Sequence, residues 1–332
     1  MIQCYSVADE NAMCMFHLEN LETYFSGHIY SSYLSFYKDV HYSLRGKNGE
    51  QELVRSETPR GCISSRSGVL CIRGHKENIY WLDFMIGDRD GDGLKIQREM
   101  LDTHLYKVGF IGWKGVEEQP IRAWLFKRVG ALLSGIIPLV RFSLRTYEIP
   151  NHPGFYERSG KEQSGKERSR YPDHVVFTEI NDKNIRKMMD GLEMAKEKFG
   201  IFAITDSSNL AGMVKKGIVH LFILERMGEV LAMYFFRDTR TMVGEGCALL
   251  ELVGSVLLKG SFGLFNDGFL DALNRIKKKN GLFARLVVDN LTDSSLLDWS
   301  EWFEISRTEG AYYSWNLVVP FSGSPFGVFV LF

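Results

Sequence analysis

The 332-residue sequence predicts a mixed α/β (α+β) protein in which two fused halves surround a mixed central sheet. Apolar runs with strand character alternate along the chain with segments of helical periodicity. Each half also gives the same order: a hairpin, a helix, a strand and then a further strand. Although no residue-level repeat is visible, this shared order indicates an internal duplication.

The N-terminal half covers residues 1–150. Two apolar runs, GCISSRSGVLCI (61–72) and NIYWLDFMIG (78–87), are separated by a polar break and predict a β-hairpin. Residues 94–110 follow with apolar side chains at helical spacing. Residues 122–128 and 136–149 are predicted strands, which completes a βαβ unit.

A charged segment, residues 151–173, repeats SGKE and is almost free of aliphatic side chains, so we predict a solvated linker loop. The C-terminal half, residues 174–332, is predicted to contain a hairpin that turns at Met227-Gly228. Its other predicted elements are helices at 184–200, 261–281 and 294–303, the hairpin strands 218–225 and 229–238, strands at 282–290 and 311–320, and a last strand near the chain end.

Composition narrows the class of protein. The net charge of −1 gives no indication of a nucleic-acid partner or a membrane surface. The five cysteines form no C-x-x-C pair, which favours a reduced, cytoplasmic chain without a zinc site or disulfides. The longest apolar stretches are broken by proline and glycine and fall short of the roughly 20 residues that a spanning helix needs, so no transmembrane segment is expected.

Residues 88–99, DRDGDGLKIQRE, match a calcium-loop pattern, with possible ligands Asp88, Asp90, Asp92 and Glu99. An EF-hand needs a helix before its loop, and the preceding IYWLDFMI is a predicted strand. We therefore expect neither an EF-hand nor a bound metal, and keep a calcium-binding module as a weaker alternative.

The same loop also fits an anion site. A strand, a loop with Gly91 and Gly93, and a helix N-terminus together offer backbone amides to a pyrophosphate. Acyl-CoA transferases of the GNAT superfamily use this device with a Q/R-x-x-G-x-G/A signature, and here the leading residue is Asp88 instead.

YYSWNLVVP (312–320), followed by GVFVLF (327–332), is similar to YYLYNWRCP and VGLVL of the N-myristoyltransferase family. The C-terminal half resembles this family in chain order and spacing. LFNDGFLDAL (264–273) resembles LMNDALILA. In the N-terminal half, GCISS (61–65) resembles GFISA, and LDFMIGDRDGDGLKI (82–96) lies without a gap over INFLCVHKKLRSKRL.

The resemblance implies two GNAT-like halves related by a pseudo-twofold axis, with acyl-CoA in the N-terminal half and the peptide mostly in the C-terminal half. It implies transfer of a fatty acyl group from myristoyl-CoA to an N-terminal glycine of a peptide or protein partner. The amides of Phe84 and Met85 would form an oxyanion hole, and the terminal carboxylate of Phe332 would act as the base. The residues matched to the CoA loop are Arg89, Gly91, Gly93, Leu94 and Lys95.

Several departures from the family fall on the chemistry. The basic HKKLRSKR of the family is DRDGDGLK here, which places carboxylates where a pyrophosphate needs cations. A family threonine corresponds to about Lys127, and the histidine of RYWHR to Leu144. The alternative function is therefore a catalytically inactive structural or interaction protein on this fold, such as a divergent viral and virion-associated version. His220 is expected to be a packed or surface residue rather than a base.

Overall fold

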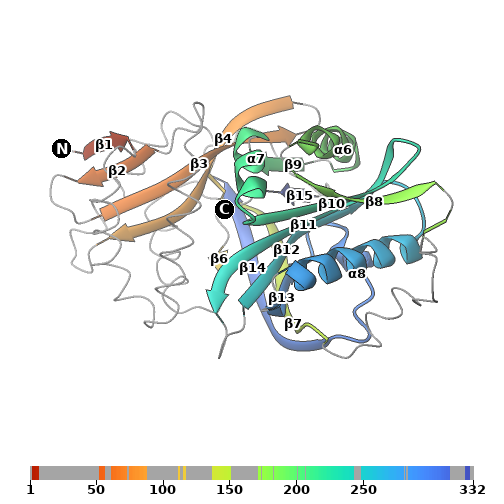
Figure 1. The fold of residues 1–332 in the computed structure, drawn as a ribbon. Coiled ribbons are helices and arrows are strands. Elements are labelled where there is room, and N and C mark those ends of the chain that lie inside the picture. Colours follow the sequence, from red (N-terminus) through yellow and green to blue (C-terminus); the bar gives the residue numbers. More distant parts are fainter. Residues whose placement is uncertain are drawn as a thin grey trace.

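The computed structural model describes residues 2–6, 52–56, 61–72, 75–87, 111–112, 115–116, 137–150, 171–172, 174–181, 183–199, 201–205, 207–242, 248–279, 281, 283–314 and 326–329. Figure 1 shows two sheets side by side, with helices packed on the second. Each sheet combines parallel and antiparallel pairs, so the predicted mixed α/β class is confirmed.

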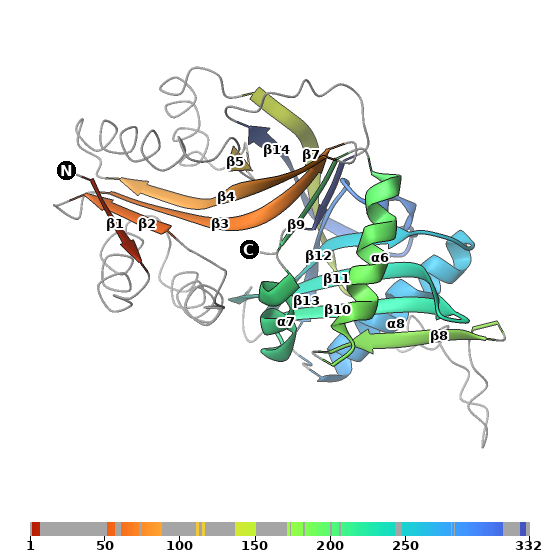
Figure 2. The ribbon, with the colours of Figure 1, turned by 90° about the horizontal axis from the view of Figure 1, so that it is seen from above.

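The first sheet contains seven of the described strands. Its main path is β1-β2-β3-β4-β5. β9 pairs with the same edge of β3 as β2 does, further along the strand, and β15 lies next to β9. The strands are β1 (Ile2–Ser6), β2 (Glu52–Ser56), β3 (Gly61–Ile72), β4 (His75–Gly87), β5 (Ile111–Gly112), β9 (Ile201–Thr205) and β15 (Phe326–Phe329). The long antiparallel β3–β4 pair confirms the first predicted hairpin. Figure 2 shows this hairpin running from β1 and β2 towards the second sheet.

The second sheet contains eight described strands in the order β6-β14-β7-β13-β12-β11-β10-β8. Its one parallel pair in the described part of the chain is β12–β13. The strands are β6 (Gly115–Val116), β7 (Ile137–Glu148), β8 (Val175–Ile180), β10 (Val219–Arg226), β11 (Glu229–Met242), β12 (Ala248–Leu257), β13 (Phe283–Asp289) and β14 (Phe303–Ser314).

The two sheets exchange strands. β7 belongs to the N-terminal half of the sequence, yet it pairs with β13 and β14 in the second sheet. In the other direction, β9 pairs with β3, and β15 pairs with β9. The predicted boundary between the halves, at residues 151–173, therefore does not coincide with a division between sheets. The domain assignment itself stays a prediction.

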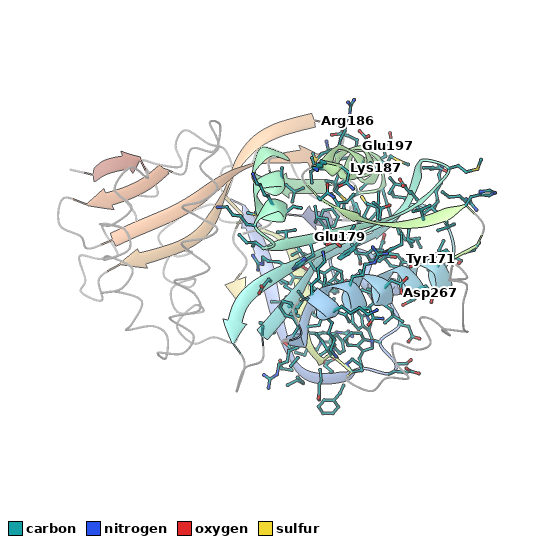
Figure 3. The ribbon with its side chains drawn as sticks, viewed as in Figure 1. Tyr171, Glu179, Arg186, Lys187, Glu197 and Asp267 are labelled. Atoms are coloured by element: carbon teal, nitrogen blue, oxygen red, sulfur yellow. The ribbon has the colours of Figure 1, made fainter. Side chains whose placement is uncertain are left out.

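Three of the described helices cover the two faces of the second sheet. α8 (Phe262–Lys279) packs on one face, and α6 (Ile185–Lys198) and α7 (Ser207–Lys215) pack on the other. Figure 3 labels Lys187 on α6 and Asp267 on α8, on opposite sides of the sheet. The buried residues of α6 recur at helical spacing, namely Met188, Gly191, Leu192 and Ala195, as the amphipathic sequence predicts.

Alternating residues of the central strands divide the core into two clusters. On β10 and β11, Phe222 and Tyr234 face α8, whereas Leu221 and Phe235 face α6 and α7. Because both faces of the sheet are covered, β10 to β12 are apolar on both sides. Burying each large apolar side chain contributes about 1.5–3 kcal/mol, so these two layers supply most of the stability of this part of the chain.

The second predicted hairpin forms as expected. β10 and β11 pair from Arg226 and Glu229, and the turn consists of Met227 (φ 54°) and Gly228 (φ 84°). Two consecutive positive φ angles are typical of the tight hairpin turn that suits the twist of the strands, and glycine adopts them without steric cost.

The prediction of a helix at 294–303 is wrong. Only a single 3-10 turn, η2 (Asp293–Leu296), forms, and β14 already begins at Phe303. Trp299 stacks on Tyr147 with ring centroids 4.6 Å apart, and its Nε1 donates to the Ser294 oxygen at 3.0 Å. Trp299 and Trp302 thus reach the core from an irregular turn, in which the Trp302 nitrogen donates to the Trp299 oxygen at 3.1 Å, although their spacing imitates one face of a helix.

Candidate functional site

The pairing of β3 with β4 contains an irregularity close to the end of β4. Leu82 pairs with Ser65 and Phe84 pairs with Ser64, so Asp83 is an extra residue in β4. Such a β-bulge interrupts the hydrogen-bond ladder and re-aims the backbone beside it. The two residues whose amides were predicted to form an oxyanion hole, Phe84 and Met85, follow this bulge directly.

The other edge of β4 carries a short parallel partner. β5 pairs with β4 at Tyr80 and Trp81, and β4 then continues to Gly87. Within the described residues, no strand pairs with this edge of β4 beyond Trp81. β4 thus has a bulge near its end, and its parallel neighbour β5 stops before that point. In this arrangement, backbone N–H groups of β4 can face a ligand.

The strand nearest the chain end lies at the junction of the two sheets. β15 runs parallel to β9, with Phe326 opposite Ile201 and Phe329 opposite Ile204, and it also contacts β12 of the second sheet. Shortly before the end of the sequence, at β15, the chain therefore lies in the middle of the molecule (Figure 2). Phe332 itself lies outside the described residues.

The second sheet repeats the arrangement seen around β4. Phe236 pairs with Leu252 and Phe235 pairs with Gly254, so Val253 is an extra residue in β12. The parallel pairing of β12 with β13 ends at Leu252, while β12 continues to Leu257. In both sheets, a bulge thus lies where a parallel strand leaves its neighbour.

Protein side chains fill the space beside the end of β12. The Ser255 nitrogen donates to Thr292 Oγ1 at 3.1 Å, and the Leu257 nitrogen donates to Asp293 Oδ2 at 2.8 Å. Lys198 forms an ion pair with Asp293 and donates to the Leu257 oxygen at 3.0 Å. The N–H groups that a ligand could bind at this edge are therefore already satisfied by the chain itself.

A buried ion pair lies further along the same strands. Arg237 of β11 donates to Glu251 of β12, and their side chains are 17% and 9% exposed. Leu250 and Leu252 face α8, so Glu251 between them lies on the opposite face of the sheet. Both charged side chains have further interactions, so this polar pair is well embedded. Sequence analysis did not single it out.

Most of the predicted site residues lie outside the described residues. This applies to the CoA-loop set of Arg89, Gly91, Gly93, Leu94 and Lys95, and to the calcium alternative of Asp88, Asp90, Asp92 and Glu99. Phe84 and Met85 are on β4, as the resemblance implied, and their catalytic role stays a prediction. Leu144 lies on β7, where it pairs with Asp289 and Thr308.

The element before the acidic loop is a strand. β4 extends to Gly87, immediately ahead of Asp88, so the entering helix of an EF-hand does not exist here. Among the described residues, no cluster of histidine, cysteine and carboxylate side chains could hold a metal ion. No described helix combines the length and apolar character needed to cross a membrane.

Sequence analysis missed several elements that shape this region. β9, α7 and β12 were not predicted, and Thr292 and Asp293 were given no role. For β12 a signal existed in the run ALLELVGSVL, which is apolar on both faces, as buried strands are. For Thr292 and Asp293 no local signal existed, because their partners on β12 are 37 and 36 residues away in the chain.

Comparison with solved structures identifies the fold, while no protein-family model and no curated protein matches the sequence. A Saccharomyces cerevisiae N-myristoyltransferase with bound myristoyl-CoA aligns with 99% of this chain and 89% of its own, at 12% identity and a TM-score of 0.62. A second structure of that enzyme, with myristoyl-CoA and inhibitors, aligns with 95% and 80% at 13% identity and 0.58.

A GCN5-related N-acetyltransferase from Kribbella flavida also aligns, with 95% of this chain and 70% of its own, at 7% identity and a TM-score of 0.54. These identities are low, whereas the aligned shares are large in both directions. The chain therefore has the mixed α/β fold that N-myristoyltransferases and GNAT-like N-acetyltransferases share.

Proposed function

We propose that the chain is an N-myristoyltransferase-like acyltransferase that moves a fatty acyl group from acyl-CoA to an N-terminal glycine. The observation that carries the proposal is the bulge at Asp83, directly before Phe84 and Met85 on β4. The parallel neighbour β5 pairs with β4 only at Tyr80 and Trp81, before the bulge. The shared fold and the matched order of sequence segments support the same assignment.

The contrast between the two sheets supports acyl-CoA binding at β4 rather than at β12. At the end of β12, Thr292 and Asp293 accept hydrogen bonds from the strand, so a thioester would have to displace them. Replacing a satisfied, partly buried carboxylate contact costs about 1.5–3 kcal/mol, which disfavours a ligand there. The N-terminal sheet is thus the better candidate for the donor.

The proposed reaction uses groups of the main chain. The terminal carboxylate of Phe332 takes a proton from the glycine ammonium, and the neutral amine attacks the thioester carbonyl carbon. The amides of Phe84 and Met85 donate to the oxyanion that forms. Collapse of this intermediate breaks the C–S bond, and the coenzyme A thiolate leaves with the second amine proton. The products are an N-acylglycine and free coenzyme A.

Acyl transfer from labelled myristoyl-CoA to peptides that begin with glycine tests the proposal. The protein used must end at Phe332, and peptides that begin with alanine serve as the substrate control. One residue appended after Phe332 should abolish turnover, whereas one residue added before Met1 should not. Turnover that survives the C-terminal addition would rule out the carboxylate as the base. Absence of both turnover and acyl-CoA binding in calorimetry would refute the enzymatic assignment.

A second candidate is a non-catalytic interaction protein on the same fold. It is favoured by residues at matched positions: Leu144 cannot exchange protons as the family histidine can, and Asp88, Asp90 and Asp92 replace basic residues. This candidate predicts no saturable binding of either acetyl-CoA or myristoyl-CoA. Calorimetry with both donors therefore separates the two candidates, and the preferred donor would also distinguish fatty acyl transfer from acetylation.

A further inference from the structure

A group of lysines lies at the end of the second sheet where β10 begins. Lys216, which follows α7 directly, and Lys279, the last residue of α8, line the same cavity of about 880 Å³. Asn181, which follows β8 directly, lines it too, so three segments of the chain meet around this cavity. We name the lysines of these segments the basic rim: Lys183, Lys215, Lys216, Lys277, Lys278 and Lys279.

The basic rim is more positive than the chain as a whole. The whole sequence contains 40 lysine and arginine residues against 41 acidic residues. In the three segments 179–183, 215–219 and 277–281, the sequence has six lysines, and its only acids are Glu179 and Asp182. Asp238 also lines the cavity. The cations therefore outnumber the carboxylates two to one, an excess that the overall net charge of −1 conceals.

Most of these lysines are exposed and have no partner within the described part of the chain. Four ammonium groups make no hydrogen bond or ion pair there, namely those of Lys183, Lys215, Lys216 and Lys278. Lys279 forms an ion pair with Glu179, with Nζ and Oε1 2.6 Å apart (Glu179 is labelled in Figure 3). Lys277 donates to the Pro150 oxygen at 3.4 Å. The rim thus offers several cations to a partner outside the chain.

Helix dipoles explain only part of this pattern. Lysines favour the last turn of a helix because they offset its dipole, which accounts for Lys215 and for the three lysines that end α8. Lys183 lies instead just before α6, where the dipole disfavours a cation, and the first turn of α6 contains no acidic residue. The meeting of these segments at one end of the sheet therefore indicates a surface that suits an anionic partner.

The composition of the rim favours a lipid surface over a nucleic acid. Nucleic-acid sites commonly combine arginine, which binds phosphate through two parallel hydrogen bonds, with aromatic rings on which bases stack. The three segments contain neither arginine nor an aromatic residue. Lysines on flexible stems supply charge without a fixed geometry, and the headgroups of a fluid anionic leaflet require no more than charge.

We propose that the basic rim docks the protein on the surface of a membrane that contains anionic lipids. The lysine ammonium groups lie against the headgroups. None of the large apolar side chains that are exposed in the described structure belongs to the three segments, so the contact is electrostatic and does not enter the hydrocarbon layer. The proposal depends on the charge distribution alone and is independent of the acyl transfer proposed at β4.

Co-sedimentation of the full chain with lipid vesicles tests the docking. One set of vesicles contains phosphatidylcholine alone, and the other contains phosphatidylcholine with about 30% phosphatidylserine. We expect the protein to sediment with the anionic vesicles and to stay in solution with the neutral ones. Because salt screens exposed charges, raising the ionic strength from about 0.05 M to about 0.3 M should release the protein.

Two double variants locate the contact. Each lysine at an anionic surface strengthens binding about fivefold, so Lys216→Gln with Lys278→Gln should weaken binding to the anionic vesicles about 25-fold. Arg226→Gln with Lys259→Gln is the matched control. Both of these residues are exposed, and changing them removes the same charge beside the hairpin turn at the opposite end of β10. The control should bind within about twofold of the wild type.

The measurements decide the proposal. Binding to anionic vesicles that is lost in the rim variant and kept in the control supports it. An equal loss in both variants would show that overall charge, and not the basic rim, drives the binding. No binding to anionic vesicles, or binding that persists at high salt, would overturn the electrostatic docking. Binding of a short DNA duplex in the absence of vesicle binding would assign the rim to nucleic acid instead.

Discussion

The carboxylate of Asp293 accepts a hydrogen bond from the Leu257 nitrogen at 2.8 Å and forms an ion pair with Lys198. Three separate segments meet at this side chain: the end of β12, the turn after β13 and the end of α6. The buried carboxylate of Asp293 therefore closes off the end of β12. The corresponding position in the first sheet is the bulged end of β4.

Replacing Asp293 with alanine should destabilise the fold by about 2–4 kcal/mol, because the Leu257 N–H loses its acceptor and Lys198 its counter-charge. Urea unfolding followed by tryptophan fluorescence measures this change. Asp298→Ala is the control, since the Asp298 carboxylate is exposed and accepts a local hydrogen bond from the Ser300 nitrogen. A loss for Asp293→Ala no larger than that of the control would show that the contact contributes little.

Gly268 of α8 allows the helix to approach β11 closely. A Cβ atom at this position would lie 2.5 Å from Tyr234 Oη and 2.6 Å from Leu224 Cδ1. Tyr234 is fixed there, because its hydroxyl donates to the Phe265 oxygen at 2.6 Å. Gly268→Ala should therefore cost about 1–3 kcal/mol of unfolding free energy through overpacking.

Gly263 provides the matched control on the same helix. A Cβ atom there would meet nothing closer than Ser261 Oγ at 4.0 Å. Gly263→Ala should leave stability unchanged or raise it by up to about 1 kcal/mol, because alanine favours helix. Equal effects of the two substitutions in thermal unfolding would contradict the close approach at Gly268.

The buried His220 should make stability depend on pH. Its pKa is lowered by burial to about 4 from about 6.5, so the unfolded chain binds the proton more readily. Stability should therefore rise with pH through this window, and His220 alone should remove about 2 kcal/mol between pH 7 and pH 5. Urea midpoints of the wild type at the two pH values measure the total change.

His220→Phe should reduce that pH dependence by the same amount. If this variant keeps the full pH dependence of the wild type, the imidazole of His220 is not protonated preferentially in the unfolded chain.

The acidic loop should weaken acyl-CoA binding if it lies beside the pyrophosphate. Converting Asp88, Asp90 and Asp92 to asparagine should then raise acyl-CoA affinity by about 1–3 kcal/mol, measured by calorimetry. Asp190→Asn, on the exposed side of α6, is the charge control. An unchanged affinity in the triple variant would show that the loop does not contact the donor phosphates.

The same triple variant addresses the calcium alternative. Because a strand leads into the loop, we expect calcium to leave the Tm of the wild type unchanged. A rise in Tm with calcium that the asparagine variant abolishes would instead establish a calcium site of another type.

The parts of the fold that sequence analysis predicted are those set by local pattern. Both hairpins and the helices at 185–198 and 262–279 follow from alternation, helical spacing and turn residues. The segment 294–303 was misassigned because its two tryptophans have helical spacing, although Trp299 is held by Tyr147 and the Ser294 carbonyl in an irregular chain. Tertiary packing overrides periodicity there.

The site is predictable only in part. Phe84 and Met85 were placed on β4 by the resemblance, and the bulge beside them is a property of pairing with Ser64 and Ser65 that no local pattern reveals. The residues around His220 are equally distant in sequence, since the cavity beside it joins the ends of elements from Glu179 to Phe283. Long-range contacts of this kind need the assembled sheet.

The exchange of strands between the sheets has a consequence for the integrity of the chain. β7 lies before the charged segment 151–173, yet its partners β13 and β14 come after it, while β9 and β15 extend the sheet formed by β3 and β4. A protease that nicks this segment would leave two interlaced fragments with many shared backbone hydrogen bonds. Such fragments should co-purify and refold together, and neither should regain its sheet when expressed alone.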